Sequence, residues 1–406
     1  MNLIIYTLSN GDCVHRYGKS VVIPFGGARK VLSTSPLNGG YKENLTAVFN
    51  NDGNPGAGMA CKLRAPTYEE HMRLIASELG LDPDKTAGIG TAASMENVSI
   101  KNESFENLTV TAIVTGGVEV NGGRAGDPAS FHERVGKTEV LNHGTINILL
   151  SIDADLPEGT MARALVTCTE AKTAALQELM AGSNYSSGLA TGSGTDGTIL
   201  ICNPMSGIVL TNAGKHSKLG ELIGRSVKAA VKEALFKQSG LCPGYQHSIL
   251  RRMKRYGINE EKLWLYYMEK EKETGEAMSK ADFIHRLHML EMSRGLVTLT
   301  SLFVHVLDQL EWELLDPEEA AMAGHMLLGI MKKDPDILSE PERDEDESKK
   351  AVWEGAPKAE GILPSCFTVK VAGVKGEGSG IEDVRKELLD HYTAMIANTA
   401  RGEYHV

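Results

Sequence analysis

The sequence predicts an α/β protein, with a mixed, layered α+β domain at the N-terminus and an added, mainly helical C-terminal region. In residues 1–242, apolar β-type runs alternate with amphipathic helical runs, which is typical of a sheet covered by helices. Beyond Pro243 the β-type runs give way to helical periodicity. We expect an α/β domain, a helical region, a charged linker and a small strand-loop-helix tail, at 1–242, 243–339, 340–362 and 363–406.

Composition narrows the class of protein. The chain has 406 residues, enough for two or three domains, and its net charge of −11 argues against a nucleic acid or a membrane as partner. Its six cysteines form no CxxC pair, which is typical of reduced thiols. The N-terminus lacks the basic segment of a signal peptide, and the longest apolar run, 295–307, is too short to span a bilayer. We therefore expect a cytoplasmic protein.

The first elements are expected to be strands, at 3–8, 13–17, 21–25 and 30–33. Asn10-Gly11 lies between the first two, and an Asn-Gly pair between apolar runs predicts a hairpin. The strand at 30–33 opens into a loop of hydroxyl, amide and glycine residues, which includes Ser35, Asn38, Gly39 and Gly40.

A helix and three strands are expected next. Thr67 begins the helix and forms a capping box with Glu70, and Gly80 ends it. The strands are expected at 88–94, 108–115 and 144–151. Polar residues and glycines gather at the ends of the last two strands: Thr115, Gly116, Asn142, His143, Thr145 and Asn147.

The helix expected at 155–180 places a lysine on its apolar face. Plotted at about 100° per residue, the inward face holds Met161, Leu165, Cys168, Ala175, Leu176 and Leu179. The polar face holds Arg163, Thr167, Glu170, Gln177 and Glu178. Lys172 falls in the middle of the apolar face, and a buried ammonium without a partner costs several kcal/mol. The chain must therefore supply a carboxylate, a set of other hydrogen-bond acceptors or a lowered lysine pKa. The alternative to a functional role is a purely structural ion pair, or a lysine whose ammonium reaches the rim of the apolar face.

The loop at 191–197 runs directly into a strand at 198–202. Its glycines match the dinucleotide pattern G-x-G-x-x-G, but that pattern must follow a strand and open a helix. We interpret the loop instead as one wall of a polar site, with Thr191, Gly192, Thr195 and Asp196 as its candidate residues.

A second regular helix is expected from Ser217 to residue 236, with Gly220 and Gly224 one turn apart for close packing. Lys215 and His216 directly precede its cap, where a helix N-terminus can receive an anionic group. An ordinary exposed loop is the alternative interpretation.

The C-terminal region is expected to hold three or four helices between 248 and 331, with breaks at 257, 273–275 and 316–317. A stripe of His285, His288, Met289 and Met292, followed by His305, permits a soft metal, although methionine at helical spacing usually fills a core. A charged run follows at 340–350. The tail combines a strand at 366–371, a glycine loop at 373–380 and a helix at 381–398.

The polar loops predict the kind of ligand. The chain contains no G-x-S-x-G, H-E-x-x-H or Walker A motif. Loops of like character occur at 33–40, 115–117, 142–147, 191–197 and 214–216. Amides, hydroxyls and few charges suit a large, mostly neutral ligand that bears many amides or hydroxyls. The candidate binding residues are Ser35, Asn38, Gly39, Gly40, Thr115, Gly116, Asn142, His143, Asn147, Thr191, Gly192 and His216.

Five segments together resemble the adenosylcobinamide amidohydrolase (CbiZ) family: 32–40, 144–148, 169–176, 190–196 and 214–224. The resemblance spans residues 5–240 and does not cover 245–406. It implies hydrolysis of the amide that joins a corrinoid side-chain propionate to aminopropanol. The products would be adenosylcobyric acid and aminopropanol, a step of corrinoid salvage, and the corrinoid would be substrate rather than cofactor.

Amide hydrolysis needs an activated nucleophile, an oxyanion stabiliser and a proton donor. Our hypothesis has Asp196 activate water or orient the hydroxyl of Thr195 or Thr145. Lys172 would tune Asp196 or act as the acid, and glycine-loop amides with Asn147 or Asn38 would stabilise the oxyanion. Metal-assisted hydrolysis is the variant mechanism, with His143, Asp196 and His216 as ligands; metal dependence stays open and no metal site is assigned.

Two other functions fit the same residues. One is a corrinoid-binding protein without catalysis, and the other is an amidohydrolase that acts on another tetrapyrrole or amide. The C-terminal region is free to cover the site, to form a homodimer or to act as an independent module.

Overall fold

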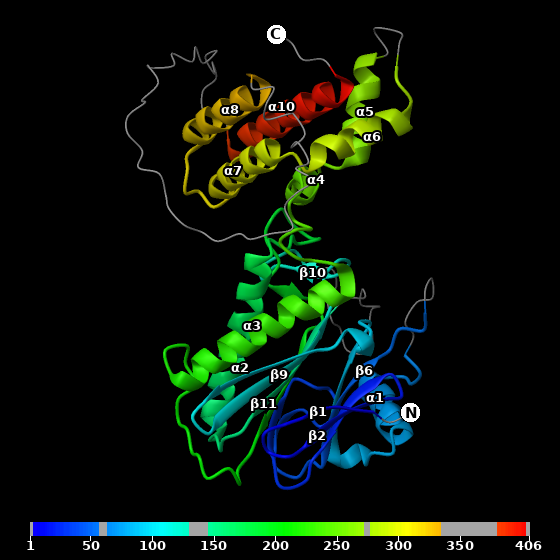
Figure 1. The fold of residues 1–406 in the computed structure, drawn as a ribbon, viewed down its shortest axis with the longest axis vertical. Helices are drawn as coiled ribbons and strands as arrows, with labels where there is room; N and C mark the ends of the chain where they lie inside the picture. Colours follow the sequence, from blue (N-terminus) through cyan, green and yellow to red (C-terminus); the bar gives the residue numbers. More distant parts are fainter. Residues whose placement is uncertain (1–2, 57–62, 130–144, 272–276, 334–379, 403–406) are drawn as a thin grey trace, which may run out of the picture. The chain divides into compact units, whose positions relative to one another are not determined.

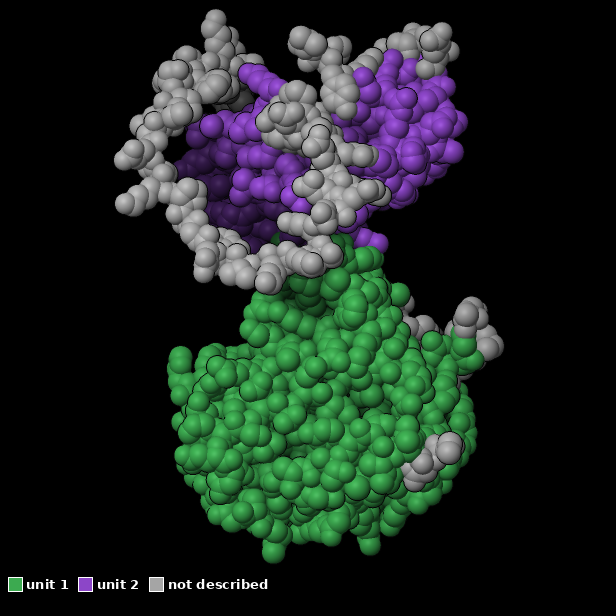
Figure 2. All heavy atoms as spheres, in the orientation of Figure 1, with its two compact units in different colours: residues 1–246 green, residues 247–406 purple. Residues whose placement is uncertain are grey.

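The structure is a computed structural model that describes residues 3–56, 63–129, 145–271, 277–333 and 380–402 (Figure 1). The chain divides into two compact units, Met1–Gln246 and His247–Val406, which Figure 2 shows in different colours. Several predicted features lie outside the described residues: Asn142, His143, the break at 273–275, the charged run at 340–350, and the strand and most of the glycine loop of the tail.

Unit 1 contains two main β-sheets. Sheet A is five-stranded, in the order β1-β2-β3-β6-β7, with β6 and β7 parallel and the other neighbours antiparallel. The hairpin predicted at Asn10-Gly11 is confirmed, and Gly11 adopts a positive φ of 86° that favours glycine. The strands of sheet A are β1 (Leu3–Thr7), β2 (Cys13–Tyr17), β3 (Ser20–Pro24), β6 (Ala47–Asp52) and β7 (Thr86–Thr91).

Sheet B is six-stranded, in the order β5-β4-β13-β11-β9-β8. Only its central pair, β11 and β13, is parallel. Its strands are β4 (Lys30–Ser33), β5 (Gly40–Lys42), β8 (Ser99–Phe105), β9 (Leu108–Gly116), β11 (Ile146–Ile152) and β13 (Gly197–Cys202). A short antiparallel pair, β10 (Gly122–Gly123) with β12 (Gly192–Ser193), holds the predicted site loop beside this sheet.

The two sheets pack face to face and helices cover their outer faces, which makes four layers (Figure 1). Alternate side chains of a strand point to opposite faces. In β11, Leu149 joins the core shared with sheet A, whereas Leu150 joins the core beneath α2 (Glu158–Glu178) and α3 (Lys218–Ser239). In sheet A, Phe49 packs against α1 (Tyr68–Glu78). The predicted layered α/β fold is confirmed.

The helix caps identified in the sequence are present. Thr67 Oγ1 accepts a hydrogen bond from Glu70 N at 3.2 Å, and the Glu70 carboxylate accepts one from Thr67 N at 3.1 Å. Ser217 Oγ accepts one from Gly220 N at 3.0 Å. Each cap satisfies backbone donors that have no partner inside the helix and is worth about 1 kcal/mol.

Two predictions about helix faces are wrong. Thr167, expected on the polar face of α2, is buried, because its hydroxyl donates to the Ala213 carbonyl at 2.7 Å in the segment that leads into α3. Gly224, expected to allow close packing, faces open space, since a Cβ added there meets nothing within 4 Å. Gly220 does pack closely, because a Cβ there would stand 2.0 Å from the Gly214 carbonyl oxygen.

Unit 2 is helical, as predicted. Its described α-helices are α4 (Ile249–Met253), α5 (Glu260–Glu271), α6 (Lys280–Glu291), α7 (Arg294–Glu311), α8 (Pro317–Lys333) and α10 (Ile381–Arg401). Five of them fall between 249 and 333, so the expected three or four is too few: the chain also turns between α6 and α7, where no glycine or proline marks a break. Tyr392 of α10 stacks on Phe303 of α7, with ring centroids 5.2 Å apart, which joins the tail helix to the core of this unit.

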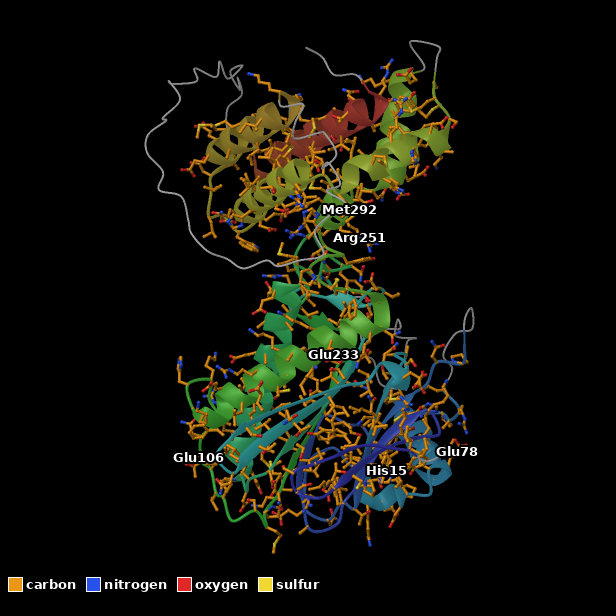
Figure 3. All side chains as sticks on the ribbon, in the orientation of Figure 1. His15, Glu78, Glu106, Glu233, Arg251 and Met292 are labelled. Carbon is orange, nitrogen blue, oxygen red and sulfur yellow. The ribbon has the colours of Figure 1, made fainter. Side chains whose placement is uncertain are left out.

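The histidine and methionine stripe of α6 does not fill the core. Met289 and Met292 are 50% and 60% exposed, and Met292 is labelled in Figure 3. The inward positions belong instead to Phe283, Leu287 and Leu290, because the neighbouring helices meet that side of α6. No single described helix is long and apolar enough to cross a membrane; α6 and α7 pass that test only as a pair, which is bent by 81°.

Candidate functional site

The candidate site lies at one edge of sheet B, where β9 and β4 end and β11 and β13 begin. Thr115 of β9 stands opposite Asn147 of β11, and Asn147 stands opposite Gly197 of β13. Directly after β4, Thr34 Oγ1 accepts a hydrogen bond from Thr198 N at 2.9 Å. Strand pairing therefore gathers the described parts of the loops at 115–117, 142–147 and 191–197 at this edge.

An ion pair between Lys172 and Asp196 forms the centre of the site. Lys172 extends from α2, and its Nζ contacts Oδ2 of Asp196 in the loop before β13. The two side chains are 11% and 14% exposed, so both are largely but not completely withdrawn from water. The lysine on the apolar face of α2 thus has the carboxylate partner that a buried ammonium requires.

Four donors surround the Asp196 carboxylate. Oδ1 accepts hydrogen bonds from Ile146 N at 2.8 Å and from Ser193 Oγ at 2.7 Å. Oδ2 accepts one from Ser193 N at 3.0 Å in addition to that from Lys172. Charge-assisted hydrogen bonds of this number hold the carboxylate in one orientation, so Asp196 in turn fixes the positions of Lys172 and Ser193.

Ser193 is a site residue that the sequence analysis did not assign. Its hydroxyl points at Asp196 because the loop places the two residues three apart, a spacing at which hydroxyls and carboxylates bond locally. The Ser-x-x-Asp spacing could have identified it. Gly192 makes the arrangement sterically feasible, since a Cβ at that position would stand 2.3 Å from Asp196 Oδ2 and 2.7 Å from Lys172 Nζ.

A row of buried amides continues from this centre into the space between the sheets. Asn147 Oδ1 accepts from Gly197 N at 3.1 Å, and its Nδ2 donates to Asn50 Oδ1 at 2.8 Å. Asn50 Nδ2 donates to Thr115 Oγ1, also at 2.8 Å. These groups satisfy one another and join sheet A to sheet B. Asn50 could not be predicted as a site residue from local sequence patterns, because it lies 97 residues from Asn147 along the chain.

The threonines of the site anchor its loops. Thr145 Oγ1 donates to the Thr195 carbonyl at 2.5 Å. Thr191 Oγ1 accepts from Ala125 N at 2.9 Å, and the Thr191 carbonyl accepts from Thr173 Oγ1 of α2 at 3.0 Å. These bonds hold the loop at 191–197 against α2.

The loop at 33–40 is held by contacts of its own. Ser35 Oγ accepts from Leu37 N at 3.0 Å, and Asn38 Nδ2 donates to the Thr86 carbonyl at 2.8 Å. Gly39 lies against the Ser35 carbonyl, which a Cβ would meet at 2.1 Å, and Gly40 has a positive φ of 77°. The polar side chains of this loop bond to backbone rather than to Lys172 or Asp196. Gly116 faces Ile146 and Leu235, on the side of sheet B that α3 covers.

His216 lies at the opposite end of sheet B. Lys218, at the start of α3, places its ammonium 4.7 Å from the centroid of the Phe105 ring. Phe105 pairs with Leu108 at the start of β9, whereas Thr115 stands near the other end of that strand. The structure therefore does not bring the exposed His216 together with Asp196, as the metal variant would need.

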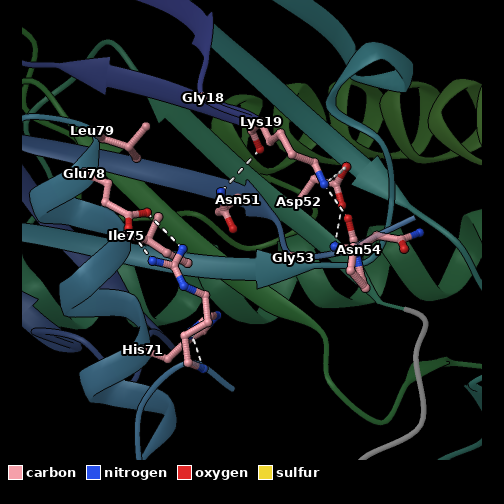
Figure 4. Close-up of a pocket in the computed structure, with 12 residues that line it drawn as sticks. Gly18, Lys19, Asn51, Asp52, Gly53, Asn54, His71, Ile75, Glu78 and Leu79 are labelled. Atoms are coloured by element: carbon pink, nitrogen blue, oxygen red, sulfur yellow. Dashed lines mark hydrogen bonds and ion pairs between the residues drawn. The ribbon is translucent and has the colours of Figure 1, made fainter. Parts of the chain in front are cut away.

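A pocket of about 910 Å³ lies on the α1 side of sheet A (Figure 4). Arg64 pairs with Glu78 across its rim at 2.9 Å, and this hydrogen bond lowers the pKa of the Glu78 carboxyl. Burial, and then the nearby Arg64 charge, lower the pKa of His71. Lys19 lies 3.6 Å from Asp52, so the charges of the pocket occur in pairs.

The pocket and the ion-pair centre are separate. Asn51 lines the pocket, whereas its neighbour Asn50 points to the opposite face of β6, into the amide row. Of the predicted site residues that the structure describes, none lines this pocket. We place the candidate chemistry at Lys172, Ser193 and Asp196, because the ion pair there is hydrogen-bonded to a hydroxyl and holds it in position.

The family comparison agrees with the resemblance seen in the sequence. The CbiZ family, adenosylcobinamide amidohydrolase, matches residues 5–243. The uncharacterized protein MJ1613 of Methanocaldococcus jannaschii is 36% identical over an alignment of 231 residues, and the match covers 54% of this chain and 87% of that protein. The solved structure of the PH0078 protein from Pyrococcus horikoshii OT3 is 15% identical, with a TM-score of 0.28, covering 63% of this chain and 91% of that chain. The chain belongs to the adenosylcobinamide amidohydrolase family.

Proposed function

We propose that this protein hydrolyses the amide bond between a corrinoid side-chain propionate and aminopropanol in adenosylcobinamide. The products are adenosylcobyric acid and aminopropanol. The family match supports the reaction class, and it covers all of unit 1 except its ends. The observation that carries the proposal is the Lys172–Asp196 pair with the Ser193 hydroxyl bonded to it, inside the matched range.

The proposed roles follow from the contacts. Ser193 Oγ attacks the amide carbon, and its proton passes through the Asp196–Lys172 pair to the leaving nitrogen. Water then hydrolyses the ester that forms, so one water is consumed for each amide cleaved. Asp196 orients the hydroxyl and the ammonium. The role proposed for Lys172 is to stabilise, by its positive charge, the negative charge that develops during the reaction.

This assignment modifies the hypothesis drawn from the sequence. Thr195 and Thr145 were the candidate hydroxyls, but Thr145 donates to a backbone carbonyl while Ser193 donates to Asp196. Asn147 and Asn38 were candidate oxyanion donors. Both side-chain amides already donate to protein acceptors, which favours structural roles for them.

The test is incubation of the full-length protein with adenosylcobinamide, followed by mass analysis of the corrinoid and quantification of aminopropanol. We expect the mass change of amide hydrolysis in wild type and its loss in Ser193→Ala, Lys172→Met and Asp196→Asn. Ser193→Ala leaves three donors on Asp196, so its cost to folding is about 1 kcal/mol and circular dichroism should stay unchanged.

Lys215→Met is the matched control, because Lys215 forms an exposed pair with Glu170 in the same unit and should be dispensable. Full turnover by Ser193→Ala would refute the hydroxyl assignment. Cobinamide binding by wild type without release of aminopropanol would refute hydrolysis and leave a corrinoid-binding protein.

A further inference from the structure

Helices α8 and α10 of unit 2 approach each other closely. Gly324 of α8 lies against Leu388 of α10, since a Cβ added to Gly324 would stand 2.5 Å from a Leu388 methyl carbon. Leu388 is fully buried in the core of this unit. The residues next to this contact, His325 on α8 and Glu387 on α10, therefore meet just outside the core.

His325, Glu387 and His391 form a cluster at this contact. His325 Nε2 lies 3.0 Å from Glu387 Oε1, and the rings of His325 and His391 have centroids 5.2 Å apart. Glu387 and His391 are four residues apart on α10, so they share one face of that helix. One possible ligand atom from each of the three residues lies within 4.8 Å of the others.

We propose that these three residues bind a divalent transition-metal ion, with Zn²⁺ as the best fit, and that the ion ties α8 to α10. Two imidazoles and one carboxylate are a known three-residue ligand set for zinc, with water completing the tetrahedron. Imidazole ligands disfavour Mg²⁺ and Ca²⁺, which take oxygen donors. The ion replaces the proton in the His325–Glu387 hydrogen bond.

The geometry allows this with small side-chain movements. Zinc bonds of about 2.0–2.1 Å place the donors of a tetrahedral site about 3.3 Å apart. The observed limit of 4.8 Å therefore requires the most distant donors to approach each other by about 1.5 Å at most. His325 is 29% exposed and Glu387 41% exposed, so neither side chain is locked by packing.

A bound ion would stabilise unit 2. His325 and Glu387 are 62 residues apart along the chain, so the ion closes a long loop and restricts the unfolded chain. An ion that binds only the folded state raises stability by mass action. The site is independent of the hydrolysis proposed for unit 1.

The test uses the full-length protein, stripped of metal with a chelator and dialysed. Titration with ZnCl₂ in a calorimeter should show a saturable site that is weakened roughly tenfold or more in His325→Ala, Glu387→Gln and His391→Ala. Zinc should also raise the thermal midpoint of unit 2, followed by tryptophan fluorescence, in wild type but not in these variants. Spectra with Co²⁺ distinguish nitrogen and oxygen ligands from thiolates.

His247→Ala is the matched control. His247 belongs to the same unit and to no three-residue cluster of possible metal ligands among the described residues. The zinc affinity of this variant should equal that of wild type. Unchanged affinity in both His325→Ala and His391→Ala, or no saturable binding by wild type, would overturn the site. Binding at this cluster without a rise in the thermal midpoint would overturn its role as a tie between the helices.

Discussion

Asp196→Asn tests the energetic importance of the ion-pair centre. The substitution preserves size but removes the charge opposite Lys172. All four partners of the carboxylate are donors, and an asparagine side chain has only one acceptor oxygen. In one orientation its NH₂ group faces Ile146 N, and in the other it faces Ser193 N and Lys172. Either way a buried donor loses its acceptor.

The magnitude follows from burial. Both members of the pair are less than 15% exposed, so water screens the unpaired ammonium only weakly. Removing one partner of a buried ion pair costs about 3–5 kcal/mol, and we expect Asp196→Asn to lower the free energy of unfolding of unit 1 by that amount. Lys172→Met should cost less, about 1–3 kcal/mol, because Asp196 keeps Ile146 N, Ser193 N and Ser193 Oγ as donors.

Chemical denaturation can assign these losses to the correct unit. All three tryptophans, at 264, 312 and 353, belong to unit 2, so their fluorescence follows that unit alone. Far-ultraviolet circular dichroism follows both units, and the transition that it shows without a fluorescence change belongs to unit 1. The reasoning is refuted if Asp196→Asn costs no more than Lys172→Met. The double variant should recover part of the loss, because no unpaired charge remains.

Three further predictions address packing, capping and pH. Gly192→Ala should destabilise unit 1 and abolish activity, because the added Cβ would overlap the Lys172–Asp196 ion pair. Gly224→Ala should instead stabilise α3 by about 0.5–1 kcal/mol, since alanine favours a helix and the added Cβ meets open space. Equal effects of the two substitutions on the free energy of unfolding would contradict this reasoning. Thr67→Ala removes the capping box of α1 and should lower the free energy of unfolding by about 1 kcal/mol. Amide hydrogen exchange should become faster only at the start of α1, and an equal increase along the whole helix would argue against the capping role. Hydrogen bonds from Lys228 and then Lys232 lower the pKa of Glu178 below its ordinary value of 4.5. The ionised Glu178 therefore contributes to the stability of unit 1 above pH 4.5, and this contribution is lost as the pH falls below that value. Glu178→Gln should therefore weaken the pH dependence of the midpoint on the acid side, and an unchanged acid limb would exclude a role for this pair.

Much of the fold follows from the sequence because local rules determine it. The Asn10-Gly11 turn, the Thr67 capping box and the Ser217 cap depend on residues within a few positions of each other, and all three are present. The alternation of β-type and helical runs likewise predicts layers, since each pattern matches the period of its element. Periodicity also identified Lys172 as a buried lysine that needs a partner.

Tertiary structure decided which groups meet. The partner of Lys172 stands 24 residues away, and only the pairing of β11 with β13 and of β10 with β12 places Asp196 and Ser193 beside α2. Periodicity in α6 indicated only the stripe of His285, His288, Met289 and Met292, whereas the neighbouring helices bury the adjacent positions of Phe283, Leu287 and Leu290. His216 shows the converse, because its loop resembles the others in composition and yet lies at the far end of sheet B. Residue type and spacing determine local conformation and burial, whereas contacts between distant segments depend on strand order and helix packing, which no local pattern encodes.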